Sequence, residues 1–162
     1  MPTFCPTGII RHNVLIPLAS PEKIYRAFLS SKEHTEFTGS EAKCSTKVGG
    51  RFTTWGKYIS GKNVELVEGK KIVQEWKTSE WPQGYEPSIL KISLKKKGGG
   101  TELSMTQSRV PASQVDQYDK GWYESYWELM NASSSNLILG EFDHAQRRNE
   151  ALIRTTADFL VQ

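Results

Sequence analysis

Hydrophobic and polar positions alternate along much of the first two thirds of the chain, which is the period of a half-buried β-strand. Ile10, Val14 and Ile16 share one face of residues 10–18, and His12 falls on the same face. The alternation returns six times, at residues 42–46, 51–55, 58–67, 72–78, 90–94 and 101–110. Because the connections between these later segments are too short for crossover helices, the pattern predicts an antiparallel meander, with about seven strands in all.

Two short helices are predicted directly after the first strand. Ser20 precedes Pro21, so a helix begins there with serine as its N-cap and proline at its first position. Ser30 and Glu33 have the spacing of a capping box at the start of the next helix. Gly39 is placed to end that second helix.

A long aromatic helix is predicted after the last strand. At about 100° per residue, one broad apolar stripe collects Val115, Tyr118, Trp122, Tyr123, Tyr126, Trp127, Leu129 and Met130. The apolar face of the sheet is the natural partner of this stripe, since each fully buried aromatic ring contributes about 2 to 3 kcal/mol. Gly121 interrupts the helix, and we expect it to let a strand or a bulky ring approach the helix backbone closely.

Length, charge and cysteine content exclude several classes of protein. The chain has 162 residues, 21 Lys and Arg against 18 Asp and Glu, and a net charge of +3, too small an excess to indicate a nucleic-acid partner. No apolar run is long enough to span a membrane, and no secretory start is visible. Cys5, Cys44 and three histidines lack the spacings of a zinc site. We therefore expect a cytoplasmic protein with reduced thiols, no metal and no cofactor.

Several short motifs occur in order between residues 14 and 132, at 20–28, 49–52, 66–76, 81–84, 101–103 and 121–127. With the order of elements, they resemble the α+β helix-grip fold of the START and birch-pollen-allergen-like superfamily, in which a curved antiparallel sheet wraps around a C-terminal helix. Within that superfamily, the chain is most similar to the C-terminal domain of the activator of heat-shock protein 90 ATPase homologue family. The Trp-Pro-x-Gly loop at residues 81–84 indicates the eukaryotic co-chaperone branch.

The resemblance implies one helix-grip domain, residues 9–132. Residues 133–162 form an accessory C-terminal segment outside the resemblance, and the stripe of apolar residues there predicts a helix from about residue 143 to 160. The implied function is a non-enzymatic, co-chaperone-like module that binds heat-shock protein 90 and raises its ATPase rate. Such a module would stabilise a closed arrangement of the chaperone, which is a shift of populations.

Two groups of residues are candidates for the contact with this partner. Large rings in a loop often anchor interfaces, although they equally fold back over the open end of a sheet. Lysines at hairpin tips either steer an acidic partner or simply form a solvated turn. The loop candidates are Trp81, Pro82 and Tyr85, and the lysine candidates are Lys95, Lys96 and Lys97, with Lys70 and Lys71 at a second tip.

A carrier or sensor of an apolar small molecule is the alternative function. Helix-grip relatives often hold an apolar pocket between sheet and helix, and rings in that position either line a pocket or fill the core. The candidate lining residues are Trp76, Trp122 and Tyr126, with His12 and Gln74 as polar groups on inward faces. An enzyme is the third alternative, since Asp119 on the helix would serve as an acid or base if it faced a cavity, although none of the common catalytic motifs occurs.

Overall fold

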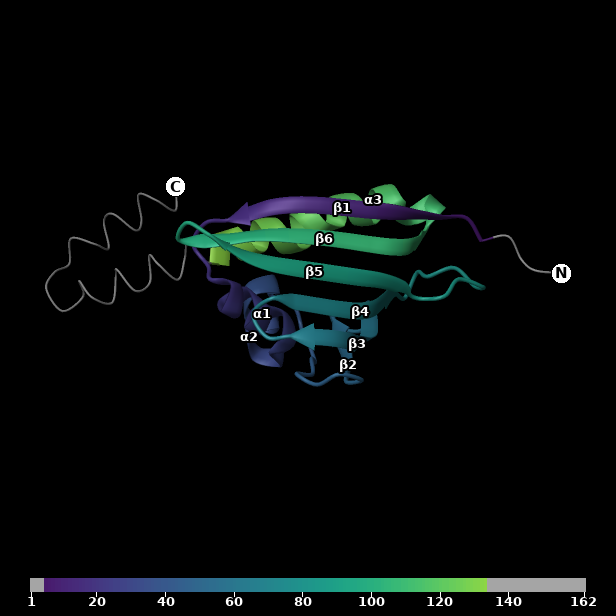
Figure 1. Ribbon diagram of the computed structural model, residues 1–162. Coiled ribbons are helices and arrows are strands. Elements are labelled where there is room, and N and C mark those ends of the chain that lie inside the picture. Colours follow the sequence, from purple (N-terminus) through teal and green to yellow (C-terminus); the bar gives the residue numbers. More distant parts are fainter. Residues whose placement is uncertain (1–4, 134–162) are drawn as a thin grey trace, which may run out of the picture.

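A six-stranded antiparallel sheet forms the framework of the protein (Figure 1). The computed structural model describes residues 5–133. The strands are β1 (Thr7–Ile16), β2 (Arg51–Thr54), β3 (Ile59–Val67), β4 (Lys71–Thr78), β5 (Ser88–Lys97) and β6 (Gly100–Pro111). Their order is β1-β6-β5-β4-β3-β2, so the last five strands form the predicted meander and the first strand pairs with the last.

The two predicted short helices are confirmed as α1 (Pro21–Leu29) and α2 (Ser31–Thr38). The Ser20 hydroxyl accepts a hydrogen bond of 3.2 Å from the backbone N–H of Lys23, and Ser30 caps α2 in the same way. Gly39 ends α2 in the left-handed conformation, with φ of 74°, where a residue without Cβ has no steric penalty. Local sequence therefore determines both ends of this segment.

The aromatic helix is confirmed, with an irregularity that the sequence pattern did not predict. A single 3-10 turn, η1 (Ala112–Gln114), leads into α3 (Val115–Trp122), a π-helical turn η2 (Tyr123–Trp127) follows, and helical structure continues to residue 133. Figure 1 shows this helix running along the sheet beside β1 and β6. The wider π turn lets two adjacent rings, Tyr126 and Trp127, both be buried. Within the described residues, no helix is long and apolar enough to cross a membrane.

The core lies between the concave face of the sheet and the helices. Alternate residues of the central strands point inward and are almost fully buried, namely Ile72, Leu90, Ile92, Leu103 and Met105. The rings of the C-terminal helix and Phe28 of α1 pack against them. The α+β helix-grip architecture predicted from the sequence is therefore confirmed.

The predicted number of strands was one too high. Residues 42–46 form only an isolated β-bridge, between Lys43 and Thr53, instead of a strand. The Asn63 side chain explains the difference, because its Nδ2 donates to the carbonyls of Ser45 and Lys47 at 2.8 and 3.0 Å. Side-chain bonds thus hold the backbone here as a loop. The helix predicted at residues 143–160 lies outside the described residues and stays a prediction.

Gly61 on β3 provides a test of the register of the sheet. A Cβ at this position would overlap the backbone carbonyl of Glu75 on β4 and press on the ring of Phe52 on β2. We predict that Gly61→Ala lowers the free energy of unfolding by about 2 to 3 kcal/mol, as overpacking does in closely packed interiors. Urea denaturation measures this change. Gly99→Ala is the control, because a Cβ there meets no atom within 4 Å, and equal stability of the two variants would contradict the register.

Candidate functional site

A cavity of about 410 Å³ lies between the β2–β3 turn, the end of β4 and the C-terminal helix. Its wall consists of Trp55, Tyr58, Ile59, Trp76, Gln117, Tyr118, Gly121, Trp122, Ser125 and Tyr126. The volume falls in the range of about 300 to 1,000 Å³ that is usual for small-molecule sites. No residue of this wall carries a charged side chain, so the cavity suits an uncharged and largely apolar molecule.

Gly121 keeps the helix side of the cavity open. A Cβ built on Gly121 would meet no atom within 4 Å, so no strand or ring packs against it. The expectation that this glycine allows a close approach to the helix backbone is therefore wrong. Its missing side chain instead leaves open space on the helix side of the cavity.

Trp55 forms the opposite side of the cavity from an unusual backbone conformation. Its φ is 53°, in the left-handed region that bulky residues rarely adopt, and Gly56 follows with φ of 70°. A hydrogen bond of 3.2 Å from the Tyr58 N–H to the Trp55 carbonyl closes this turn. Such outliers persist where surrounding structure holds them, often at functional sites.

The indole N–H of Trp55 has no partner. Within residues 5–133, its Nε1 is the one buried side-chain nitrogen or oxygen without a hydrogen bond. The Trp55 side chain nevertheless lies close enough to the Tyr126 hydroxyl to act on the pKa of that hydroxyl as a hydrogen-bond donor would. Leaving a buried donor unpaired costs about 1 to 3 kcal/mol. This N–H is enclosed by protein atoms and is not exposed to the cavity.

A cluster of rings closes the cavity at the end of β4. Trp76 packs on Trp122, with ring centroids 5.7 Å apart, and edge-on against Tyr118 at 5.3 Å. Trp81 stacks on Tyr118 at 5.9 Å, and its Nε1 donates to the Glu86 carbonyl at 2.9 Å. The Trp81 ring therefore folds back over the end of the sheet, which is the second of the two alternatives given for this loop.

The remaining loop candidates are tied less closely to this cluster. The Tyr85 hydroxyl donates to the carbonyl of Pro6 at 2.9 Å, which fastens the loop to the start of β1. Pro82 is half-buried. The loop of Trp81, Pro82 and Tyr85, here named the aromatic end, therefore lies beside the first described residues of the chain.

Tyr126 belongs to a buried polar chain behind the cavity. The Phe28 carbonyl can only accept, so His34 Nδ1 donates to it at 3.1 Å and Nε2 accepts from the Tyr126 hydroxyl at 3.1 Å. Thr54 donates to the same hydroxyl oxygen at 3.3 Å. Burial lowers the pKa of His34 to about 4 and raises the pKa of Tyr126. Both groups are therefore uncharged at neutral pH.

The wall offers little chemistry for catalysis. Burial raises the pKa of Tyr118 to about 12, and its hydroxyl already bonds Thr78 at 2.6 Å and Gln114 at 3.0 Å. No wall residue is a carboxylate, histidine, lysine or cysteine. Across residues 5–133, no group of three or more histidine, cysteine, aspartate or glutamate side chains could hold a metal ion. The arrangement is suited to binding.

Two predicted lining residues lie elsewhere in the core. His12 Nδ1 accepts from the Trp127 indole at 2.9 Å, and His12 Nε2 donates to Asp119 at 2.7 Å. Gln74 donates to Asn63 at 2.9 Å and borders a separate void of about 10 Å³. Both residues point inward as predicted, but neither is part of the cavity wall, because each lies at a position along its strand where the core is filled. Asp119 likewise lies outside the wall.

Three of the ten wall residues, Trp76, Trp122 and Tyr126, were predicted from the sequence, and the structure brings them together. The other seven were missed as lining residues, namely Trp55, Tyr58, Ile59, Gln117, Tyr118, Gly121 and Ser125. Tyr118 had a usable signal, since it lies one turn on the N-terminal side of Trp122. The Trp-Gly pair between two strands was the signal for Trp55.

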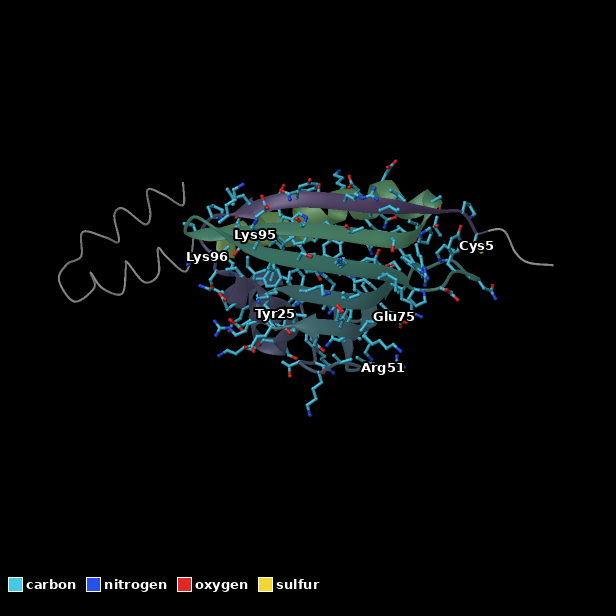
Figure 2. All side chains as sticks on the ribbon, viewed as in Figure 1. Cys5, Tyr25, Arg51, Glu75, Lys95 and Lys96 are labelled. Atoms are coloured by element: carbon cyan, nitrogen blue, oxygen red, sulfur yellow. The ribbon has the colours of Figure 1, made fainter. Side chains whose placement is uncertain are left out.

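The lysines of the two hairpin tips come together at one end of the sheet. The backbone N–H of Leu94 donates to the Lys70 carbonyl at 2.8 Å, which joins the β3–β4 turn to the β5–β6 hairpin. This surface, named the basic end, consists of Lys70, Lys71, Lys95, Lys96 and Lys97. Figure 2 shows Lys95 and Lys96 at the end of the molecule opposite Cys5, and Cys5 contacts the aromatic end through Gly84. The two groups of partner candidates are therefore separated by the length of the sheet.

Ion pairs neutralise only part of the basic end. Lys71 pairs with Glu65, and Lys97 pairs with Glu102 at 3.2 Å. Among the described residues, Lys70, Lys95 and Lys96 have no carboxylate within 4 Å, and all three are exposed. The unpaired positive charge of the tips is thus concentrated at one end.

A curved antiparallel sheet around an aromatic C-terminal helix, with an apolar cavity between them, defines a domain of the helix-grip class. Residues 18–133 match the family described as Activator of Hsp90 ATPase homolog 1-like protein, and the chain belongs to this family. The resemblance found in the sequence is therefore confirmed.

Among known proteins, the chain is 33% identical over 111 residues to Activator of 90 kDa heat shock protein ATPase homolog 1 of Homo sapiens. The match covers 68% of this chain but 32% of that protein, so the chain spans about a third of its length. An HSP90 activator from Plasmodium falciparum has a TM-score of 0.67 at 24% identity, over 83% of this chain and 96% of that one. Ara h 8.0201 has a TM-score of 0.65 at 11% identity, over 81% and 99%. These two structures show the shared fold.

The lowered pKa of His34 predicts a loss of stability in mild acid. In the unfolded chain the His34 imidazole is protonated near pH 6.5, whereas in the folded protein it stays neutral until about pH 4. The free energy of unfolding therefore falls as the pH drops through this window. Between pH 7 and pH 5, we expect His34 to account for a loss of about 2 kcal/mol. Urea denaturation at both values measures it. His34→Gln removes the titrating group, and an unchanged difference between pH 7 and pH 5 in that variant would contradict the assignment.

Proposed function

We propose that this protein is a co-chaperone-like module that binds heat-shock protein 90 in the cytoplasm and stimulates its ATPase. The match of residues 18–133 to the activator family carries the proposal. The 33% identity to a human protein named as an activator of this ATPase supports it. The module would act by binding a closed arrangement of the chaperone more tightly than the open one, and so by raising its population.

The module would have no chemistry of its own. The wall of its cavity holds no acid, base or nucleophile beyond alcohols, phenols and an amide, and the buried phenols of Tyr118 and Tyr126 have raised pKa values. Stimulation of a partner's ATPase requires only differential binding to that partner's conformations. The proposal of a non-enzymatic role rests on this composition.

We assign the first contact with an acidic surface of the chaperone to the basic end. Lys70, Lys95 and Lys96 project from one end of the sheet without an ion pair within 4 Å among the described residues. Concentrated charge of one sign speeds association with a surface of opposite sign, and the effect declines with salt. The aromatic end is a weaker candidate, because the Trp81 ring and the Tyr85 hydroxyl already have partners within the protein.

Charge reversal tests this assignment. We predict that the double variant Lys95→Glu, Lys96→Glu binds heat-shock protein 90 about five- to tenfold more weakly at low salt, since each rim charge contributes about 0.2 to 1 kcal/mol. Stimulation of the ATPase at subsaturating concentrations falls in parallel. Affinity is measured by titration calorimetry, and ATPase stimulation by phosphate release.

A matched control reverses two lysines at the other end of the sheet. Lys57 and Lys77 are exposed near the paired residues Ile59 and Thr78, so Lys57→Glu, Lys77→Glu changes the net charge equally. We expect it to bind as the unmodified protein does. Equal weakening by both double variants would refute the basic end as the contact. Absence of both binding and stimulation by the unmodified chain would refute the proposed function.

A second candidate function is the carriage or sensing of an apolar small molecule. The apolar cavity of about 410 Å³ between the helix and the end of the sheet favours it, because its volume falls in the range usual for small-molecule sites. We expect solvent extraction of the purified full chain, followed by mass spectrometry, to release a neutral aromatic compound. Protein that carries no compound and also fails to take up added apolar probes would contradict this function.

A further inference from the structure

We infer that a hollow on the outer face of the sheet binds a phosphate monoester, and that Arg51 and Lys77 are the cations that hold its phosphate group. The hollow has a volume of about 220 Å³ and lies over β2, β3 and β4, on the face of the sheet that points away from the core. Figure 2 shows two residues of its wall, Arg51 and Glu75, on the side of the sheet where β2 lies, away from Lys95 and Lys96. This hollow, here named the outer site, is separate from both the cavity and the basic end. The polar side chains of its wall are those of Arg51, Thr53, Ser60, Glu75 and Lys77.

The register of the sheet brings these side chains together on one face. Thr53 on β2 pairs with Ser60 on β3, and Ser60 pairs with Lys77 on β4. Arg51 lies two residues before Thr53 and therefore on the same face, whereas Phe52 between them is buried in the core. Because neighbouring strands are about 4.8 Å apart, the long side chains of Arg51 and Lys77 can both reach over the two hydroxyls between them.

The two cations of the outer site are available to an anion. Among the described residues, neither Arg51 nor Lys77 has a carboxylate within 4 Å, and both side chains are exposed. Glu75 is the one carboxylate of the wall, and Lys62 Nζ lies 3.9 Å from its Oε2. This ion pair offsets the negative charge of Glu75, so the outer site presents an excess of positive charge.

The donors of the outer site match a phosphate monoester in charge and in number. Such a group carries a charge of about −1.5 to −2 at pH 7 and three acceptor oxygens. The Arg51 guanidinium can bind two of these oxygens through its planar fork, and the Lys77 ammonium can bind the third as a point charge. The hydroxyls of Thr53 and Ser60 add further donors. A carboxylate, with one charge and two oxygens, would leave one cation without a partner.

The size of the outer site limits how much of the ligand it encloses. Its volume of about 220 Å³ is below the range of about 300 to 1,000 Å³ that is usual for sites of drug-sized molecules. Pro87 borders the site and offers apolar surface to the group that carries the phosphate. The outer site therefore fits a phosphate and its immediate carrier, either a phosphorylated side chain of a protein or a small phosphate ester.

Two probes of similar shape and different charge test the inference with the isotope-labelled full chain. Phenyl phosphate is mainly a dianion at neutral pH, and phenyl sulfate is a monoanion. Each is titrated at constant ionic strength, so that screening of surface charges is equal, and amide NMR signals report where it binds. We expect phenyl phosphate at millimolar concentrations to shift residues 51–53, 60–61 and 75–77. Phenyl sulfate should bind about fivefold more weakly, since its single charge pairs less fully with two cations.

Variants of single charges identify the residues that hold the phosphate. We expect Arg51→Gln to bind phenyl phosphate about tenfold more weakly, because it removes two charge-assisted hydrogen bonds, and Lys77→Gln about fivefold more weakly. Glu75→Gln removes the carboxylate of the wall and should tighten binding about threefold. Arg11→Gln is the matched control, because Arg11 is exposed on β1, the opposite edge strand of the sheet. It should bind within about twofold of the unmodified protein, since its charge is distant and screened.

Two outcomes would refute the outer site. Equal weakening by Arg11→Gln and Arg51→Gln would show that binding follows net charge alone, and phenyl phosphate that shifts no amide of the outer site would show that no such site exists. A short alanine peptide with one phosphoserine then distinguishes the two sources of the phosphate. Tighter binding of the peptide than of phenyl phosphate supports a phosphorylated protein as ligand, and weaker binding supports a small ester. Neither the co-chaperone role nor the carrier function enters this test, so its result is independent of both.

Discussion

The packing of the aromatic C-terminal helix against the concave face of the sheet is the interaction on which the rest of the structure depends. Trp122, Tyr126 and Trp127 are nearly fully buried there, and each contributes about 2 to 3 kcal/mol. Hydrogen bonds determine how the helix is rotated, since the Trp122 indole donates to Gln107 at 2.8 Å and the Trp127 indole to His12 at 2.9 Å. Buried donors need acceptors, so any other rotation would cost both bonds. The same rotation directs Gly121 toward the cavity.

The cavity and the basic end lie at opposite ends of the sheet. At one end, Gly121 and the strained turn of Trp55 leave a space that the rings around Trp76 do not fill. At the other, two hairpin tips are joined by the hydrogen bond from Leu94 to Lys70, which gathers their lysines. The proposed small-molecule site and the proposed protein-contact surface therefore share no residues. A variant designed to test one proposal leaves the residues of the other unchanged.

The architecture could be predicted from the sequence because a strand or helix with one buried face repeats its apolar residues at the period of that element. Alternation identified the six strands, the capping serines identified α1 and α2, and the aromatic stripe identified the C-terminal helix. The strand expected at residues 42–46 was wrong because Asn63, distant in sequence, bonds the carbonyls of that loop. The cavity was only partly predictable, because it depends on how the side chains of three separate elements pack together. In addition, Trp55 adopts a backbone conformation that its residue type disfavours. His12 and Gln74 faced inward as expected, but the period of a strand does not say how far along it a cavity lies.

The most direct measurement is an NMR titration of the isotope-labelled full chain with unlabelled heat-shock protein 90. If the basic end is the contact, amide signals of residues 68–71 and 94–98 shift or broaden first, and the indole signal of Trp55 stays in place. Changes confined to residues 79–87 or to the cavity wall would contradict this account, since they would locate the partner at the aromatic end. No change at any residue would contradict the proposed co-chaperone role itself.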